Sequence, residues 1–269
     1  MLSFAAAFVI RTLATALLIV IVARLAERTG PFVASTVLTL PLFAGPSYFF
    51  MLSDVSPDFL ALSALYAFAG TGAVLAFTAG YIVAAARVGL ALSLVAGSCA
   101  WLTVAVPIRV APLDGLIAAG WCLVGAAVAW FTRRTLDLHN RPGSGRAKWG
   151  PLVFRALIAG LAVASVSSVA NLIGPRVTGL VVAFPLTLSV SAWMVHRQYG
   201  AEFSAAMMAA TQRTLTSYMC FCAVLAFSAT QLGNEWAFSA ASGAALLSAA
   251  TAAVIGLWIN HSQAAQSRE

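Results

Sequence analysis

The chain has 269 residues, of which 61% are hydrophobic and 9% charged, and its mean hydropathy is +0.94. Globular domains are about half apolar and about a quarter charged, so this composition excludes an ordinary soluble protein and indicates a polytopic membrane protein. A net charge of +7 would suggest nucleic acid in a soluble chain. Here the basic residues fall mostly between apolar segments, so we expect the partner to be the lipid bilayer and expect no nucleic acid.

Apolar segments in chain order predict nine transmembrane helices, each long enough for a crossing of about 20 residues. Five precede a polar linker, at residues 4–26, 31–52, 59–86, 88–108 and 113–132. Four follow it, at residues 152–173, 177–196, 203–232 and 236–259. The linker, RRTLDLHNRPGSGRAKWG at 133–150, is too polar to lie in hydrocarbon. The predicted fold class is therefore an all-α membrane protein.

The basic residues also predict an orientation. Five of them lie in the linker, which marks it as cytoplasmic by the excess of Lys and Arg in cytoplasmic loops. With nine crossings, ten basic residues fall on the cytoplasmic side and only Arg109 and Arg176 fall outside. The N-terminus is then periplasmic and the C-terminus cytoplasmic, in a bacterial inner membrane.

An internal repeat relates two parts of the chain. Residues 11–60 align with 155–204 without a gap, and thirteen of these fifty positions are identical. The matches place Arg11 on Arg155 and Pro41 on Pro185, and they include a Gly-Pro pair at the same offset. A repeat of this kind indicates the architecture of the whole chain more strongly than any single residue does.

The matched helices are five crossings apart, so the two copies are expected to lie upside down relative to each other. We expect a first repeat at 1–112, a linking helix with the cytoplasmic linker at 113–150, and a second, inverted repeat at 151–269. Each repeat has four helices. Inverted repeats are characteristic of secondary transporters, in which the substrate site lies near the midplane at the repeat interface. A duplicated structural or assembly protein is the alternative.

The second half also resembles the GlpM family of small bacterial inner-membrane proteins. The similar stretch covers 152–259, and its matching positions are Arg155, Gly179-Leu180 and Phe184-Pro185. The first half follows the pattern more loosely, with Leu40-Pro41 but no Gly-Leu. The family is associated with alginate production, so the resemblance implies an inner-membrane location and a link to envelope polysaccharide. It implies no catalytic residues.

The prolines Pro41 and Pro185 are the first candidate site residues. Each follows a helix-starting proline by ten residues, which is about 15 Å and close to the midplane. A proline there frees the carbonyl four residues earlier, here Val37 and Val181, and hydrocarbon cannot satisfy that group. We expect a neighbouring helix, a hydroxyl such as Thr39 or Thr187, water or a ligand to do so.

Arg213 is the charge for which we expect a functional role, with Gln212 beside it. It lies eleven residues after Glu202, about 16 Å into the predicted helix, and a guanidinium cannot lose its charge there. The alternative is that the helix begins later and Arg213 contacts lipid phosphates. Arg11 and Arg155 lie within about two turns of a helix end, so their long side chains are expected to reach the lipid head groups. No acidic partner is evident for these arginines.

The function expected from these features is a secondary-transporter-like permease for a small neutral or anionic solute. The tentative substrate-binding residues are Arg213, Gln212, Pro41, Pro185, Thr39 and Thr187. The alternative is a non-transporting inner-membrane factor that supports biosynthesis of an alginate-like envelope polysaccharide. No hydrolase or metal motif is present, so we expect no enzyme activity, no metal and no cofactor. A monomer is plausible, although the sequence does not define the oligomeric state.

Overall fold

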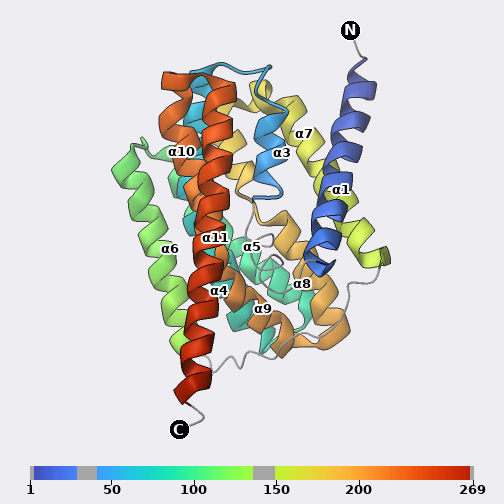
Figure 1. Cartoon of the computed structure of the whole chain (residues 1–269), viewed down its shortest axis with the longest axis vertical. Coiled ribbons are helices and arrows are strands. Elements are labelled where there is room, and N and C mark those ends of the chain that lie inside the picture. The colour runs from blue at the N-terminus through green and yellow to red at the C-terminus, as the bar shows by residue number, and fades with distance from the viewer. Residues whose placement is uncertain (1–2, 29–40, 136–148, 267–269) are drawn as a thin grey trace.

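The computed structural model of the chain describes residues 3–28, 41–135 and 149–266. Within these ranges the side chains of 25–28, 135, 213–214, 253 and 256–266 stay outside the description. The described ranges are helical and contain no strand, which confirms the prediction of an all-α chain. The helices of Figure 1 are α1 (Phe4–Arg28), α3 (Ala44–Phe49), α4 (Pro57–Ala85), α5 (Leu90–Val110), α6 (Gly115–Thr135), α7 (Trp149–Val182), α8 (Leu186–Tyr199), α9 (Ala201–Thr214), α10 (Thr216–Leu232) and α11 (Asn234–Gln266).

The outer face of the bundle is apolar, as a bilayer requires. Six stretches of the described residues are long and apolar enough to cross a membrane, the longest being Trp149–Tyr199. Large apolar side chains point outward on several helices, among them Leu17 on α1, Leu123 on α6 and Leu247 on α11, which are 61%, 71% and 72% exposed. A water-soluble monomer does not expose apolar surface on this scale. The chain is therefore a multi-pass membrane protein, and the count of nine crossings stays a prediction.

Helix α4 is the centre of the bundle, and α5, α6, α7, α9 and α10 all contact it (Figure 1). Small residues allow these close approaches. A methyl group added at Gly125 of α6 would lie 2.6 Å from the Cα atom of Gly72 of α4, which leaves no room for it. Because apolar burial does not drive helix association within lipid, packing of this kind has to hold the bundle together.

Two of the predicted transmembrane segments are each divided into two helices. The span at 177–196 is not continuous, because α7 ends at Val182 and α8 begins at Leu186, with Pro185 as its N-terminal cap residue. Proline carries no amide N–H and clashes with the preceding turn of a helix. The span at 203–232 is likewise divided into α9 and α10 at Leu215.

The boundary predicted between 173 and 177 lies inside α7, at Gly174. This residue has a φ of +77°, a left-handed value that favours glycine. The hydroxyl of Thr178 donates to the carbonyl of Ala170 over 3.3 Å, although the two residues are eight positions apart. In a straight helix they would be about 12 Å apart. The chain therefore bends sharply at Gly174.

Helices α1 and α7 cross closely at small residues. A methyl group at Gly160 of α7 would collide with the backbone carbonyl of Thr12 of α1 and would lie 3.4 Å from the amide nitrogen of Ala16. The side chains of α1 that are buried around this crossing are Thr12, Thr15, Ala16 and Ile19. The buried residues of α7 in this stretch include Ala156, Ala159, Gly160 and Val163, with Leu152 and Ala164 buried as well.

Candidate functional site

A helix begins after each of the two predicted prolines: α3 begins at Ala44, three residues after Pro41, and α8 begins at Leu186, next to Pro185. After Pro185, the amide of Ser189 donates to the proline carbonyl over 2.8 Å, and after Pro41 the amide of Gly45 does the same over 2.8 Å. Hydroxyls then bond back along both helices by four residues: Ser191 donates to the carbonyl of Thr187, and Ser47 to that of Phe43. All these residues correspond under the 144-residue offset.

The carbonyl of Val181 does not need the external partner that the sequence suggested. It accepts a hydrogen bond of 3.0 Å from the amide of Phe184, because the chain leaves the helix in a turn before the proline. The ring of Phe184 packs edge-on against Trp101 of α5, with the ring centroids 5.1 Å apart. The counterpart Val37 lies outside the described residues.

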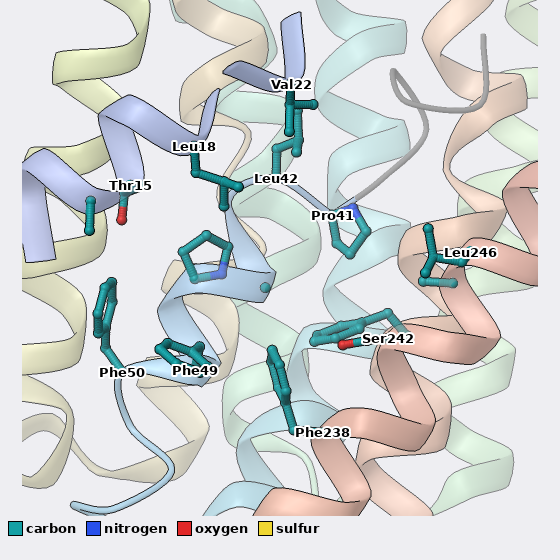
Figure 2. Close-up of a pocket in the computed structure, with 15 residues that line it drawn as sticks. Thr15, Leu18, Val22, Pro41, Leu42, Phe49, Phe50, Phe238, Ser242 and Leu246 are labelled. Atoms are coloured by element: carbon teal, nitrogen blue, oxygen red, sulfur yellow. The ribbon is translucent and has the colours of Figure 1, made fainter. Parts of the chain in front are cut away.

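A cavity of about 520 Å³ adjoins Pro41, between α1, α3, α10 and α11. In Figure 2, Thr15 and Leu18 of α1 lie on one side of this cavity and Ser242 and Leu246 of α11 on the other. Its full lining comprises Ala14, Thr15, Leu18, Val22, Pro41, Leu42, Gly45, Pro46, Phe49, Phe50, Phe221, Phe238, Ser242, Ala245 and Leu246. We call this space the α1–α11 cavity. Its volume lies in the usual range for small-molecule sites, about 300–1,000 Å³.

The lining of the α1–α11 cavity is apolar apart from two hydroxyl groups, those of Thr15 and Ser242. Thr15 is 1% exposed, and its hydroxyl has no hydrogen-bond partner among the described residues. Its neighbour Thr12 instead donates to the carbonyl of Phe8, four residues earlier. Leaving a buried hydroxyl unpaired costs about 1–3 kcal/mol, so a hydrogen-bonding group that reached this hydroxyl would be stabilised.

Of the predicted site residues, Gln212 has a defined structural role. It lies on α9 and is 7% exposed. Its amide nitrogen donates to the hydroxyl of Thr78 on α4 over 2.9 Å, and its amide oxygen accepts from the guanidinium of Arg133 on α6 over 2.9 Å. Gln212 therefore joins three helices.

The other predicted residues are dispersed. Arg213 lies in α9 with its side chain outside the described residues, and Thr39 lies outside them altogether. Thr187 is half-buried in α8, where its carbonyl accepts from Ser191. Pro41 lines the α1–α11 cavity, and Pro185 caps α8. Among the described residues, no hydrogen bond joins one of the six predicted residues to another.

Arg11 does have an acidic partner, contrary to the sequence-based expectation. Its guanidinium donates to the carboxylate of Asp54 over 2.7 Å and to the hydroxyl of Ser167 on α7 over 3.2 Å. Asn171 of α7 donates to the backbone carbonyl of Asp54, and Asn234 of α11 donates to the carbonyls of Leu52 and Val55. These bonds fasten the segment after α3 to α1, α7 and α11. Arg155 donates to Ser191 over 3.3 Å.

A buried polar network that the sequence did not suggest lies at the other end of the bundle, where α4, α8 and α9 meet. The hydroxyl of Tyr81 lies 2.7 Å from that of Ser204 and 2.9 Å from Nδ1 of His196. Ser204 donates to the carbonyl of Ala192, so Tyr81 donates to Ser204 and accepts from the Nδ1–H of His196, since each hydroxyl has one proton. Tyr81 and Ser204 are fully buried, and the network joins three helices.

Of the residues that line the cavity, sequence reasoning identified Pro41 and missed the hydroxyls of Thr15 and Ser242. In the sequence, Thr15 does not differ from other hydroxyl residues in apolar segments. Its place in the cavity depends on how α1, α3, α10 and α11 pack together. Pro46 of the cavity lining lies in the first turn of α3, where its missing amide costs little. Within the described ranges, no group of three or more His, Cys, Asp or Glu side chains is placed to hold a metal ion.

Comparison with protein-family models, with curated proteins and with solved structures finds no match to this chain. The similarity to the GlpM family therefore remains a prediction from the quoted residues. The arguments for function rest on the membrane fold and on the features described above.

Proposed function

We propose that the protein is a secondary-transporter-like permease of the bacterial inner membrane, built from two inverted four-helix repeats and one linking helix. Its N-terminus is periplasmic and its C-terminus cytoplasmic. The transported molecule is a small neutral or anionic solute, and the cavity favours the neutral kind. The observation that carries this proposal is that a helix begins after each of Pro41 and Pro185, which correspond under the 144-residue offset.

Discontinuous helices at corresponding positions of two repeats are the strongest pointer to a transporter site. Here the helix after each proline begins with the same 2.8 Å bond to the proline carbonyl, from Gly45 in one copy and Ser189 in the other. Irregular backbone at membrane depth is tolerated where protein buries it or where it lines a cavity. Pro41 meets that condition at the α1–α11 cavity.

The packing of α1 on α7 supports the repeat independently. The buried residues of α1 at this crossing are Thr12, Thr15, Ala16 and Ile19. Adding 144 to each number gives 156, 159, 160 and 163, all four of which are buried in α7. The four buried positions of α1 thus have buried counterparts in α7, which supports a pseudo-two-fold relation between the copies. Such an interface uses one patch on both partners.

The cavity lies between the two proposed repeats. Its lining comes from α1 and α3 of the first copy and from α10 and α11 of the second. No Arg, Lys, Asp or Glu is among the lining residues, so the site offers a charged solute no counter-ion. This favours a neutral substrate over an anionic one, because an unpaired charge in an apolar site is costly.

The rival proposal is a non-transporting factor that supports envelope polysaccharide synthesis. It rests on the resemblance to the GlpM family. A factor of that kind would act by binding a synthase and would produce no flux on its own.

Purified protein in liposomes tests the proposal. We expect uptake of a neutral solute to exceed that of protein-free liposomes, and to fall when Pro185→Ala restores an amide N–H at the helix restart. Ser189→Ala is the matched control, because it removes only a hydroxyl that donates to the carbonyl of Pro185 within the same helix. Absence of flux across a broad panel of solutes, with a stable complex between the protein and a synthase, would contradict the permease and favour the rival.

A further inference from the structure

We propose that the α1–α11 cavity binds an uncharged amphiphile, with a hydrocarbon body and one hydrogen-bonding oxygen, that enters from the bilayer. That this molecule is also the transported substrate rests on the proposed function. Binding is measured separately from transport.

The position of the cavity favours a ligand that comes from the lipid phase. Leu18, Phe49 and Leu246 line it and are 42%, 55% and 51% exposed, so they form its outer edge. The next residues on both flanking helices, Leu17 and Leu247, are still more exposed and apolar. The cavity thus opens on the face that contacts hydrocarbon, where dissolved apolar molecules are concentrated.

The depth of the cavity agrees with this route. Thr15 lies eleven residues after the first residue of α1, a helix of 25 residues. At about 1.5 Å per residue, its hydroxyl is about 16 Å from that end, near the middle of a hydrocarbon core about 30 Å thick. Water is scarce at that depth, so the occupant has to be soluble in the bilayer.

The lining defines the ligand's chemistry. Aromatic and aliphatic walls, with Phe221 at 1% exposure and Ala245 at 1%, match a hydrocarbon body. The unpartnered hydroxyl of Thr15 can donate to, or accept from, one oxygen of the ligand. Ser242 stands across the cavity as a second hydroxyl (Figure 2). With no charged side chain in the lining, an alcohol is favoured over a carboxylate or an amine.

Gly45 supplies part of the space. A Cβ atom added there would have no atom within 4 Å, and the residue lines the cavity. A larger side chain at this position would therefore occupy the volume that the ligand needs, without displacing the backbone of a neighbouring helix.

Photolabelling in nanodiscs of phosphatidylethanolamine and phosphatidylglycerol tests the inference. The probe is a twelve-carbon alcohol that carries a diazirine, and the competitors are 1-dodecanol, dodecane and dodecanoate. We expect labelled peptides from α1, α3 and α11, with 1-dodecanol the strongest competitor. Thr15→Val, which keeps the shape of the side chain, should weaken competition by 1-dodecanol about 3- to 10-fold, the effect of one hydrogen bond. It should leave competition by dodecane unchanged.

Gly45→Leu should abolish the labelling of these peptides. Gly120→Leu is its control, because Gly120 of α6 also has open space around an added Cβ but does not line the cavity. Labelling that survives Gly45→Leu, or equal competition by dodecane and 1-dodecanol in the wild type, would overturn the inference. Specific labelling without flux of the alcohol would contradict the proposed function and leave the site intact. Flux that Gly45→Leu leaves unchanged would overturn the site and leave the permease intact.

Discussion

Gly160→Ala tests the crossing of α1 and α7, on which the pairing of the two copies depends. The added methyl group would overlap the carbonyl oxygen of Thr12 and lie 3.4 Å from the amide nitrogen of Ala16. Both atoms belong to the backbone of α1, so only a shift of the whole helix can relieve the overlap. Overpacking of this kind costs about 1–3 kcal/mol.

Alanine also has a higher helix propensity than glycine, by up to about 1 kcal/mol, which opposes the steric cost. Gly120→Ala corrects for this gain, because an added Cβ at Gly120 has no neighbour within 4 Å. The difference between the two variants is then the steric cost alone. At roughly 3 °C per kcal/mol, the Tm of Gly160→Ala should lie about 3–9 °C below that of Gly120→Ala. Thermal unfolding in detergent measures both, and equal Tm values would refute the close crossing.

Three further predictions concern polar groups. Arg11→Gln and Asp54→Asn should each lower stability, and a double-mutant cycle should give a coupling of about 0.5–1 kcal/mol, whereas strictly additive effects would contradict the ion pair. Tyr81→Phe should destabilise the fold by about 1–3 kcal/mol, because it deprives Ser204 and His196 of a buried partner. Tyr218→Phe should cost less, because that hydroxyl makes a long contact of 3.5 Å with the carbonyl of Ala67 and a hydrogen bond with the thiol of Cys222, which is a weaker partner than a hydroxyl or an imidazole. Equal effects in chemical denaturation would count against the Tyr81 network. If Arg213 binds an anionic solute, Arg213→Gln should abolish function in a transport assay at matched protein levels while Arg213→Lys retains part of it. Wild-type behaviour of the Gln variant would leave Arg213 as a lipid-contacting residue and would agree with the neutral solute favoured above.

The sequence predicts the continuous helices well, because an apolar run bounded by charges or turn residues is a local signal. The segment 59–86 is found as Pro57–Ala85, and 113–132 as Gly115–Thr135. Asp58 lies in the first turn of α4, as expected for a carboxylate at the positive end of a helix. Interruptions within a helix are harder to predict from the sequence. The start of α8 is marked by a proline, but the break at Leu215 has neither a proline nor a glycine.

The site is harder to predict, because its parts come from distant segments. Asp54 pairs with Arg11 across 43 positions, and only the packing of α1 beside the segment after α3 brings them together. Pro41 was identified from its depth in the membrane. The position of Thr15 in the cavity could not be predicted, because residues of α10 and α11, far away in the sequence, form the rest of the lining.

The side of the membrane on which each terminus lies tests the inverted repeat most directly. Reporter fusions at the N-terminus, within 133–150 and at the C-terminus would establish this in living bacteria. We predict a periplasmic N-terminus, with the linker and the C-terminus both cytoplasmic, because an odd number of crossings separates the ends and inverts the second copy. Reporters that place both termini on the same side would mean an even number of crossings and would contradict the proposed architecture.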